Sequence, residues 1–477
     1  MKRLKNISEN NMRISLKYFR SKILLLVYIL TVSINIQAQN TNLFQLLEKG
    51  KQKYPLLKAK EANVESSERN VRSARTAYIP DLSIGHQYTY ATSNNVEGAF
   101  YPSGPLTISP SGGIHPITNN QAIFGSFTTA LLEWNIVNFG KVSAGINAAK
   151  AEKTSAQADY ENELFQYQIR LADTYLLLLI SHHLKETQQY NLQRAEAFRN
   201  TTHAKVSSGL RPGVDSSFAN AEYAKAKLLF LESEKNEQAY MYRLNELLGT
   251  VKNSISIDSM NFFSELPHSR DFSTENIVHS PFLRFHQSYI DLSKARSISV
   301  KRSFYPSLSL VAAGWARGSG ISNKTGSFRS DIGSGIDYQV SNYLLGIALR
   351  WNLTDYFRIH NDYKSLLYQA EKYEHLYLNQ LLSQKRQLKE AEMRFEVSLQ
   401  QAELAPLQFD AAQSAFEQAQ ARYESGLTDL PTFSQSLAIV NRAEADKYIA
   451  YSNAWRALLM KAAMAGDLSL FLNQVKQ

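Results

Sequence analysis

The sequence predicts a mostly α-helical protein with a small β part, organised as a tandem structural repeat. The first observation is a phrase that occurs twice: residues 134–141 read WNIVNFGK and residues 351–358 read WNLTDYFR. The second is the distance from each phrase to a later Ser-Gly-Leu, whose glycine follows the tryptophan by 75 residues in both places. The third is a long stretch after each phrase, 138–207 and 355–424, which together contain a single proline, Pro406.

Other landmarks extend the repeat over most of the chain. Each copy has two prolines 25 residues apart and two glycines 40 residues apart: Pro55 and Pro80, Pro281 and Pro306, Gly209 and Gly249, Gly426 and Gly466. Constant spacing between several landmarks indicates a duplicated unit. The sequence therefore predicts a first repeat over 42–262, a linker over 263–275 and a second repeat over 276–470.

Each repeat is expected to begin with one helix, over 42–78 in the first copy and 276–304 in the second. These helices end before the strand-start prolines, Pro80 and Pro306, because proline disfavours helical geometry in the residue before it. Apolar and small or polar residues then alternate over 82–90, which predicts a strand with one apolar face. That face carries Leu82, Ile84, His86, Tyr88 and Tyr90.

A loop and a second strand follow in each copy. The loops are expected over 93–122 and 318–341, and the second strands over 123–134 and 342–351. Short turns at Gly209 and Gly426 end the long helices and lead to returning helices. Each chain thus contributes four strands of about ten residues, which is the length of a tilted strand that crosses a bilayer.

The long helix of the second copy has a coiled-coil pattern. Apolar and small residues recur by fours and threes, with one extra four, which indicates a seam with one stutter. The seam comprises Leu366, Ala370, Tyr373, Tyr377, Leu381, Gln384, Leu388, Ala391, Phe395, Ser398, Ala402, Ala405, Phe409, Ala412, Phe416, Ala419 and Tyr423. Small residues that alternate with aromatic ones suit close packing of neighbouring helices.

Composition excludes several classes of protein. The chain of 477 residues has no cysteine, which excludes disulfides, thiolate metal sites and cysteine nucleophiles. Its formal charge is +9, but residues 1–38 hold seven bases and one acid, so the remainder carries 9 − 6 = +3. No basic run interleaved with aromatics remains, and we expect no nucleic acid partner.

Residues 1–38 predict a secretory signal peptide. A basic start is followed by ILLLVYILTVSINI, an apolar run of 14 residues, and then by small and polar residues near Ala38. This run is short for a membrane span and suits a cleaved signal. The start is Met1 or Met12, and the alternative interpretation is a single anchoring helix.

Strands of this kind require partners from other chains. Four strands cannot close a barrel, and open edges in lipid leave backbone groups unpaired. Two chains would give eight strands, and three would give twelve, with room for a lumen. Aromatic residues stand where membrane-interface anchors are expected: Trp134, Trp351, Trp315, Tyr88 and Tyr90. The alternative for Trp134 and Trp351 is a buried tryptophan before a capped helix.

In order and spacing, the tandem repeat, the prolines before the first and third strands, the Trp-Asn phrase and the two tip glycines resemble the TolC-like outer membrane efflux proteins. The resemblance covers essentially the whole mature chain. It implies a homotrimer with a twelve-stranded barrel in outer membrane lipids, continued by a helical tunnel through the periplasm. It also implies a periplasmic adaptor protein, an inner-membrane transporter, export of small molecules or proteins, and no catalysis or cofactor.

The resemblance further implies a gate at the periplasmic tip, where Asp215 and Tyr423 match family residues that hydrogen-bond between coiled coils. The alternative is that Asp215 caps its own helix and Tyr423 ends the seam. Acids often found after the second glycine are replaced here by neutral residues, so an acidic ring is not expected. The tip residues are Gly209, Leu210, Asp215, Tyr423, Gly426, Leu427, Thr432 and Gln435.

Two alternatives to a channel are a protein with a metal site and a scaffold protein. In the stretch His182-His183 followed by Glu186, two side chains four residues apart offer a possible pair of metal ligands on one helix face. The pair lacks a third ligand, so no metal site is expected. The other alternative is a secreted periplasmic coiled-coil scaffold without a pore, whose strands pack in a soluble sheet.

Overall fold

The computed structural model describes residues 42–92, 94, 118–250, 260–268, 274–322 and 324–475. The predicted signal peptide over 1–38 lies outside these residues, as do most of the loop 93–122 and part of the linker 263–275. The chain divides into two compact units. The helical unit comprises Met1–Lys58, Glu163–Ile277 and Gln384–Gln477, and the sheet unit comprises Ala59–Asn162 and Val278–Ser383.

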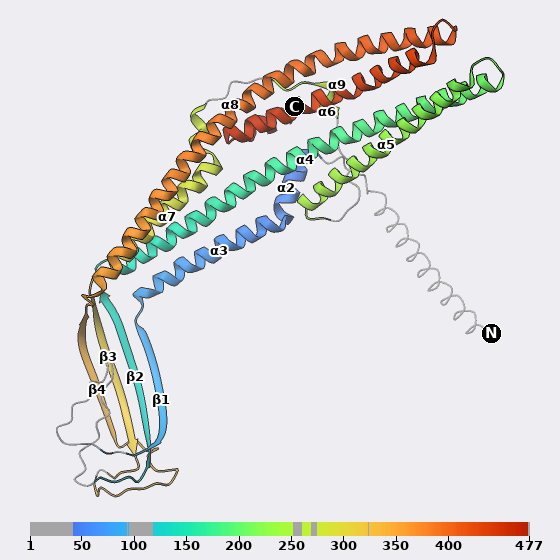
Figure 1. The fold of residues 1–477 in the computed structure, drawn as a ribbon. Coiled ribbons are helices and arrows are strands. Elements are labelled where there is room, and N and C mark those ends of the chain that lie inside the picture. Colours follow the sequence, from blue (N-terminus) through green and yellow to red (C-terminus); the bar gives the residue numbers. More distant parts are fainter. Residues whose placement is uncertain are drawn as a thin grey trace, which may run out of the picture. The chain divides into compact units, whose positions relative to one another are not determined.

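The sheet unit contains a four-stranded antiparallel sheet in the order β1-β2-β3-β4 (Figure 1). Its strands are β1 (Asp81–Ala91), β2 (Ile123–Val137), β3 (Ser307–Ser319) and β4 (Val340–Arg350). In the part of the chain that the structure describes, β1 pairs only with β2 and β4 only with β3. The sheet is therefore open, with one unpaired edge on β1 and another on β4.

Helices lead into and out of this sheet and are tied together by ion pairs. They are α3 (Pro55–Arg75), α7 (Pro281–Ser303) and the sheet-proximal parts of α4 (Lys141–Ser207) and α8 (Asp355–Glu424). Lys60 of α3 bonds to Asp159 of α4 at 2.6 Å, and Arg296 of α7 bonds to Glu152 of α4 at 3.1 Å. Contacts of this kind fix the helices that position the helix-side ends of the four strands.

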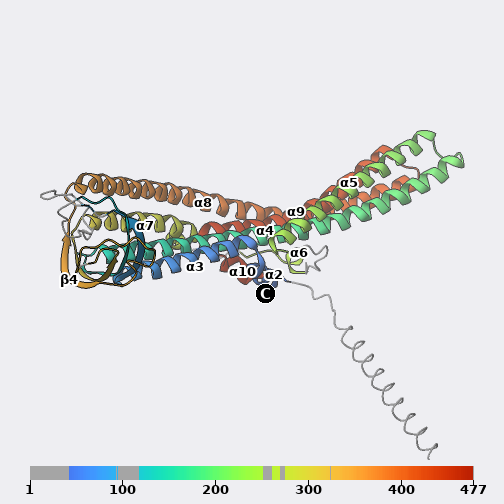
Figure 2. The ribbon, with the colours of Figure 1, turned by 90° about the horizontal axis from the view of Figure 1, so that it is seen from below.

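The helical unit consists of two helix hairpins and the short helices that pack on them. The first hairpin pairs α4 with α5 and the second pairs α8 with α9, side by side in both Figure 1 and Figure 2. The returning helices of the hairpins are α5 (Gly213–Leu247) and α9 (Leu430–Ala465). The short helices are α2 (Leu43–Lys53), α6 (Met260–Ser264), η3 (Thr274–His279) and α10 (Ser469–Val475). The core includes the fully buried Tyr167, Leu171 and Leu178 of α4, with Phe471 of α10.

The two initial helices differ from the prediction of continuous helices over 42–78 and 276–304, which was wrong. In the first copy α2 ends at Lys53 and α3 begins at Pro55, and a short η2 (Thr76–Tyr78) follows. In the second copy η3 ends at His279 and α7 begins at Pro281. Proline suits the first turn of a new helix, and it forces the residue before it into extended geometry.

The predicted seam of α8 is confirmed. Every one of its residues from Leu366 to Tyr423 is buried or half-buried, and none is exposed. Ala412, for example, packs in a cluster with Leu437, Val440 and Ala443 of α9. The helix runs without interruption through Pro406.

Candidate functional site

The repeated Trp-Asn phrase forms the same contact in both copies. The indole nitrogen of Trp134 donates to the carbonyl of Tyr78 at 3.0 Å, and that of Trp351 donates to the carbonyl of Phe304 at 3.1 Å. Each acceptor lies two residues before a strand-start proline. The tryptophans are 41% and 49% exposed, so the alternative of simply buried tryptophans does not hold. Each indole therefore ties the exit of one strand to the entrance of another.

The chain leaves the sheet differently in the two copies. Strand β2 continues past Trp134 to Val137, with a register shift between Asn135 and Val137. Helix α4 then begins at Lys141, where the Asn138 carbonyl accepts the backbone N–H of Lys141 at 2.9 Å. In the second copy β4 ends at Arg350, before the tryptophan, and α8 begins at Asp355, whose carboxylate lies 3.4 Å from Arg358. Arg358 is therefore paired within its own helix.

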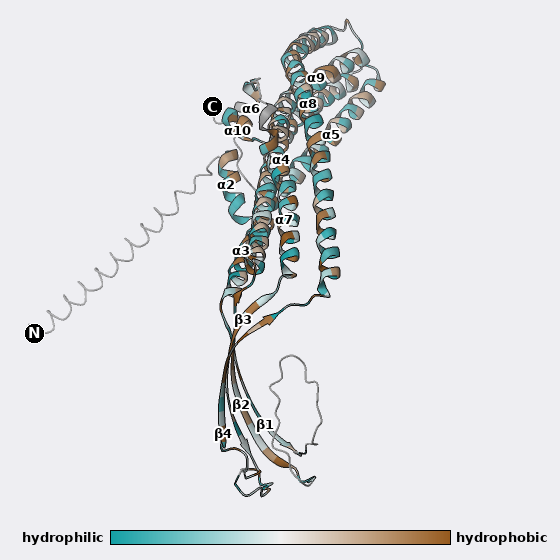
Figure 3. Cartoon of the chain, turned by 90° about the vertical axis from the view of Figure 1, so that its left-hand side faces the viewer, coloured by the Kyte–Doolittle hydropathy of each residue, from teal (hydrophilic) through white to brown (hydrophobic). Residues whose placement is uncertain are grey.

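The register of the sheet separates two faces with different chemistry. Residues directly opposite each other on neighbouring strands share a face. All four charged residues of the strands fall on one side, the charged face: Asp81, Glu133, Arg317 and Arg350. The other side, the apolar face, carries Leu82, Ile84, Ala130, Leu132, Leu310, Ala312, Leu345, Ile347 and Leu349. In Figure 3 brown stretches run along the strands, whereas the helices mix teal and brown turns.

The predicted anchors do not all lie on the same face. Tyr88 and Tyr90 lie on the apolar face, where both rings pack on Phe124 with centroids 5.3 and 4.6 Å away. The Tyr88 hydroxyl donates to the carbonyl of Ser334 at 3.1 Å, in the loop between β3 and β4. Trp315 pairs with Thr129 and Asn342 and thus lies on the charged face.

The two hairpin turns have matching geometry. Gly209 and Gly426 have φ values of 72° and 75°, the left-handed region that glycine adopts without strain. Leu210 N–H bonds to the Lys205 carbonyl at 2.9 Å, and Leu427 N–H bonds to the Arg422 carbonyl at 2.8 Å. This is the Schellman arrangement, which satisfies the last carbonyls of a helix. It leaves the side chains of Leu210 and Leu427 74% and 71% exposed.

The other residues near the tips range from buried to exposed, and one aspartate there caps a helix. Asp429 caps α9, accepting the backbone N–H of Thr432 at 3.1 Å, and hydrogen bonds from Thr432 lower the pKa of its carboxyl. Asp215 is buried in the first turn of α5, where the cap residue is Pro212 and makes no side-chain cap bond. The hydroxyl of buried Tyr423 has no hydrogen-bond partner in the described chain. Thr432 and Gln435 are exposed.

The sequence matches the family of outer membrane efflux proteins over residues 46–250 and 275–458, which is most of the chain. The chain belongs to the outer membrane efflux protein family. This efflux protein is an outer membrane channel that extends into the periplasm, and the scaffold without a pore finds no support. No curated protein sequence shows significant similarity to the chain.

Solved structures share the fold of the efflux protein. It aligns with VceC of Vibrio cholerae at a TM-score of 0.70 and 16% identity, covering 89% of this chain and 96% of that one. With CmeC of Campylobacter jejuni the TM-score is 0.72 at 15% identity, over 90% and 86% of the two chains. With the open state of MtrE of Neisseria gonorrhoeae it is 0.69 at 13% identity, over 89% of each.

A polar cluster surrounds the histidine pair of the efflux protein. His182 Nδ1 lies 2.6 Å from Glu237, which also accepts a 2.6 Å bond from Lys185. Burial opposes ionisation of Glu237, but the donors outweigh it and lower the pKa of its carboxyl. His183 packs between Phe263 and Tyr448, and burial lowers the pKa of its imidazole. In the described ranges, no three side chains of the histidine, cysteine or carboxylate type are placed so that they could hold a metal ion.

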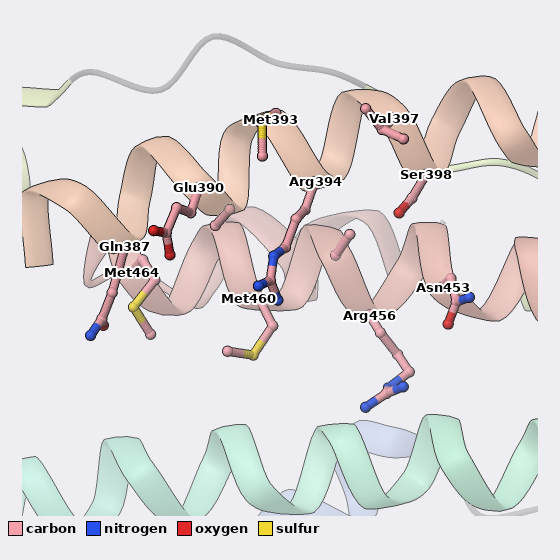
Figure 4. A pocket seen from close by; sticks show the side chains of 12 residues that line it. Gln387, Glu390, Met393, Arg394, Val397, Ser398, Asn453, Arg456, Met460 and Met464 are labelled. Carbon is pink, nitrogen blue, oxygen red and sulfur yellow. The ribbon is translucent and has the colours of Figure 1, made fainter.

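The described helices of the efflux protein were compared with the needs of a membrane span, and two of them border a groove. Within the described residues, no helix combines the length and hydropathy needed to cross a bilayer. A groove of about 480 Å³ lies between α8 and α9 (Figure 4). Met393, Met460 and Met464 line it, together with Arg394. Arg456 points from its wall toward α4, where it pairs with Asp173 at 2.7 Å.

Sequence reasoning missed the contacts that join the two hairpins at their tips. Arg211 and Phe198 of the first hairpin both contact Tyr423 of the second. The only sequence feature that pointed to a role for Arg211 at the tip is its position two residues after the turn glycine Gly209. The partner lies 212 residues away, so no local pattern could predict the pair.

Proposed function

We propose that this efflux protein forms the outer-membrane duct of a tripartite export system, assembled as a trimer whose twelve strands close one barrel. The observation that carries the proposal is an open sheet with an exposed apolar face. In the single chain Ile84, Leu345 and Ile347 are 76%, 74% and 68% exposed. Apolar side chains on two edge strands suit lipid, and unpaired edge groups in lipid cost several kcal/mol each.

The barrel is oriented by its two faces. The apolar face lies against lipid, and the charged face lines the water-filled lumen, because charged residues on a lipid face destabilise barrels by up to about 2–4 kcal/mol. Tyr88, Tyr90 and Trp134 then anchor the lipid side, together with Trp351 beyond the end of β4. Trp315 lies on the lumen side in this orientation, so it is not proposed as a lipid anchor.

Labelling of single cysteines tests the orientation, since the chain has no native cysteine. Ser83 and Ile84 are neighbours on β1 that point to opposite faces. In native membranes, we expect a water-soluble maleimide to label Ser83→Cys and to leave Ile84→Cys protected. Labelling of both would indicate a soluble sheet, and the reverse pattern would invert the faces.

The hairpin tips are proposed as the docking site of a periplasmic adaptor, which in turn joins an inner-membrane transporter. The exposed Leu210 and Leu427 support this, because matched apolar side chains at two turns suit a protein partner. Tyr423 and Asp215 are proposed to close the tip through a neighbouring copy. Support comes from the buried Tyr423 hydroxyl, which has no partner in the described part of its own chain. Thr432 and Gln435 leave no acidic ring for divalent cations there.

A further inference from the structure

The tips of the two hairpins share one aromatic core. Tyr423, Leu430 and Phe433 form a buried cluster with Phe416, all from the second hairpin. Phe198 of the first hairpin packs on it, with its ring centroid 5.0 Å from Phe433 and 5.8 Å from Tyr423. Tyr423 therefore lies in the aromatic contact that joins the two hairpin tips.

Arg211 of the first hairpin holds Tyr423 in two ways. Its guanidinium donates to the Tyr423 carbonyl at 3.1 Å, and the guanidinium carbon lies 4.7 Å from the centre of the Tyr423 ring. That carbonyl lies in the last turn of α8, where the helix carries partial negative charge. A planar guanidinium can stack on a ring and donate hydrogen bonds from its edge, which an ammonium cannot do equally well.

The duplication does not repeat this contact. Thr428 takes the place of Arg211 two residues after the second glycine, and Val206 takes the place of Tyr423 three residues before the first. In this contact the first hairpin supplies the guanidinium, and the second supplies the ring and the carbonyl. Lys205 of the first hairpin also lies over the Tyr423 ring, 5.9 Å from its centroid, but the bond to the Tyr423 carbonyl comes from Arg211.

We propose that Arg211 is a positioning residue that clamps the first hairpin tip onto Tyr423 of the second hairpin within the same chain. Its consequence for gating rests on the proposed function, since a chain that is not a gated duct would keep the clamp without a gate. Loss of the clamp leaves the first tip free to move away from the second.

Distance measurement between the tips tests the clamp without relying on transport. Ser208 and Ser425 are exposed and immediately precede the two tip glycines, so Ser208→Cys and Ser425→Cys place one spin label on each tip. Labelled chains are co-expressed with an excess of unlabelled full-length chains, so that pulsed electron resonance reads the distance within one chain. We expect Arg211→Ala to widen the distribution and shift it to longer distances, and Arg211→Lys to restore it partly.

Arg199→Ala is the matched control. The Arg199 guanidinium lies 4.0 Å from the Tyr223 ring, and both residues belong to the first hairpin. Removing this cation–π pair should leave the distance between the tips unchanged. An Arg211→Ala distribution equal to that of the parent, or equal widening by Arg199→Ala, would overturn the clamp.

Bilayer conductance of the same variants separates the clamp from the gate. If Arg211→Ala separates the tips and raises conductance, the clamp and the gated duct are both supported. If the tips separate without any rise in conductance, the clamp stands and the proposed gate at this tip is refuted.

Discussion

Close contacts of single residues decide where the short helices dock. Gly50 of α2 faces Tyr167 of α4, which is fully buried and donates its hydroxyl to the Leu247 carbonyl at 2.9 Å. A Cβ at position 50 would lie 1.8 Å from that hydroxyl. The sequence marks Gly50 as a glycine inside a helix, but only the fold shows that the reason is a side chain 117 residues later.

Gly50→Ala should therefore destabilise the helical unit by about 1–3 kcal/mol, as overpacking of a filled core does. Gly145→Ala is the control, because Gly145 also lies in a helix but its Cβ would meet nothing closer than 4.0 Å. That change should stabilise the protein slightly, by about 0.5–1 kcal/mol, through the better helix propensity of alanine. Denaturant unfolding measures both, and equal effects would contradict the packing argument.

His183 gives the helical unit a dependence on pH. Its ring is half-buried against Phe263 of α6 and Tyr448 of α9, and it lies 3.5 Å from the carboxylate of Glu186 on its own helix. Burial lowers the pKa of His183 in the folded state, so the unfolded chain takes up the proton first, near pH 6.5. The stabilisation is complete above that pH and declines as the pH falls toward the lowered folded pKa.

We expect His183→Gln to reduce the loss of unfolding free energy between pH 7 and 5, by at most about 1.4 kcal/mol per pH unit for one proton. His375→Gln is the control, because that imidazole is 74% exposed. Chemical unfolding at several pH values gives the comparison. If the parent and His183→Gln lose stability in parallel, burial of His183 does not set the pH dependence.

Among the elements, the long helices and the sheet were predicted well because their periodicities are strong. The seam of α8 follows from steps of three and four, and the strand positions follow from alternation after a proline. The break between α2 and α3 was missed. The prediction ran one helix through Pro55, whereas this proline occupies the first turn of a new helix. The position of Trp315 on the charged face required the register, which combines strands far apart in the sequence.

Ala412→Glu tests the packing of the second hairpin. Ala412 is 7% exposed among Leu437, Val440 and Ala443, so a carboxylate there must be buried or must separate α8 from α9. We expect a loss of about 1–3 kcal/mol or more in the free energy of unfolding. Ala411→Glu places the same charge one residue earlier, on the exposed side of α8, and should cost much less. Equal losses would remove the seam assignment.

At the scale of the whole molecule, the open sheet is the reason for proposing an assembly of several chains. The number of strands per chain could be predicted from the sequence, and with it the need for other copies. The tip contacts could not, since Arg211 and Tyr423 lie on different hairpins and meet only after both have folded. The tip is thus part predicted, in its two turn glycines, and part found, in the aromatic core around Tyr423.

The most direct test of the account is the number of chains in the membrane-extracted particle. Four strands per chain with two unpaired edges require other copies, and the proposed trimer closes a twelve-stranded barrel. Native mass spectrometry of the full-length protein, released from detergent micelles or nanodiscs, counts the copies. A trimer is the predicted result. A stable monomer, which would leave the sheet open, or a dimer, which would give only eight strands, would contradict it.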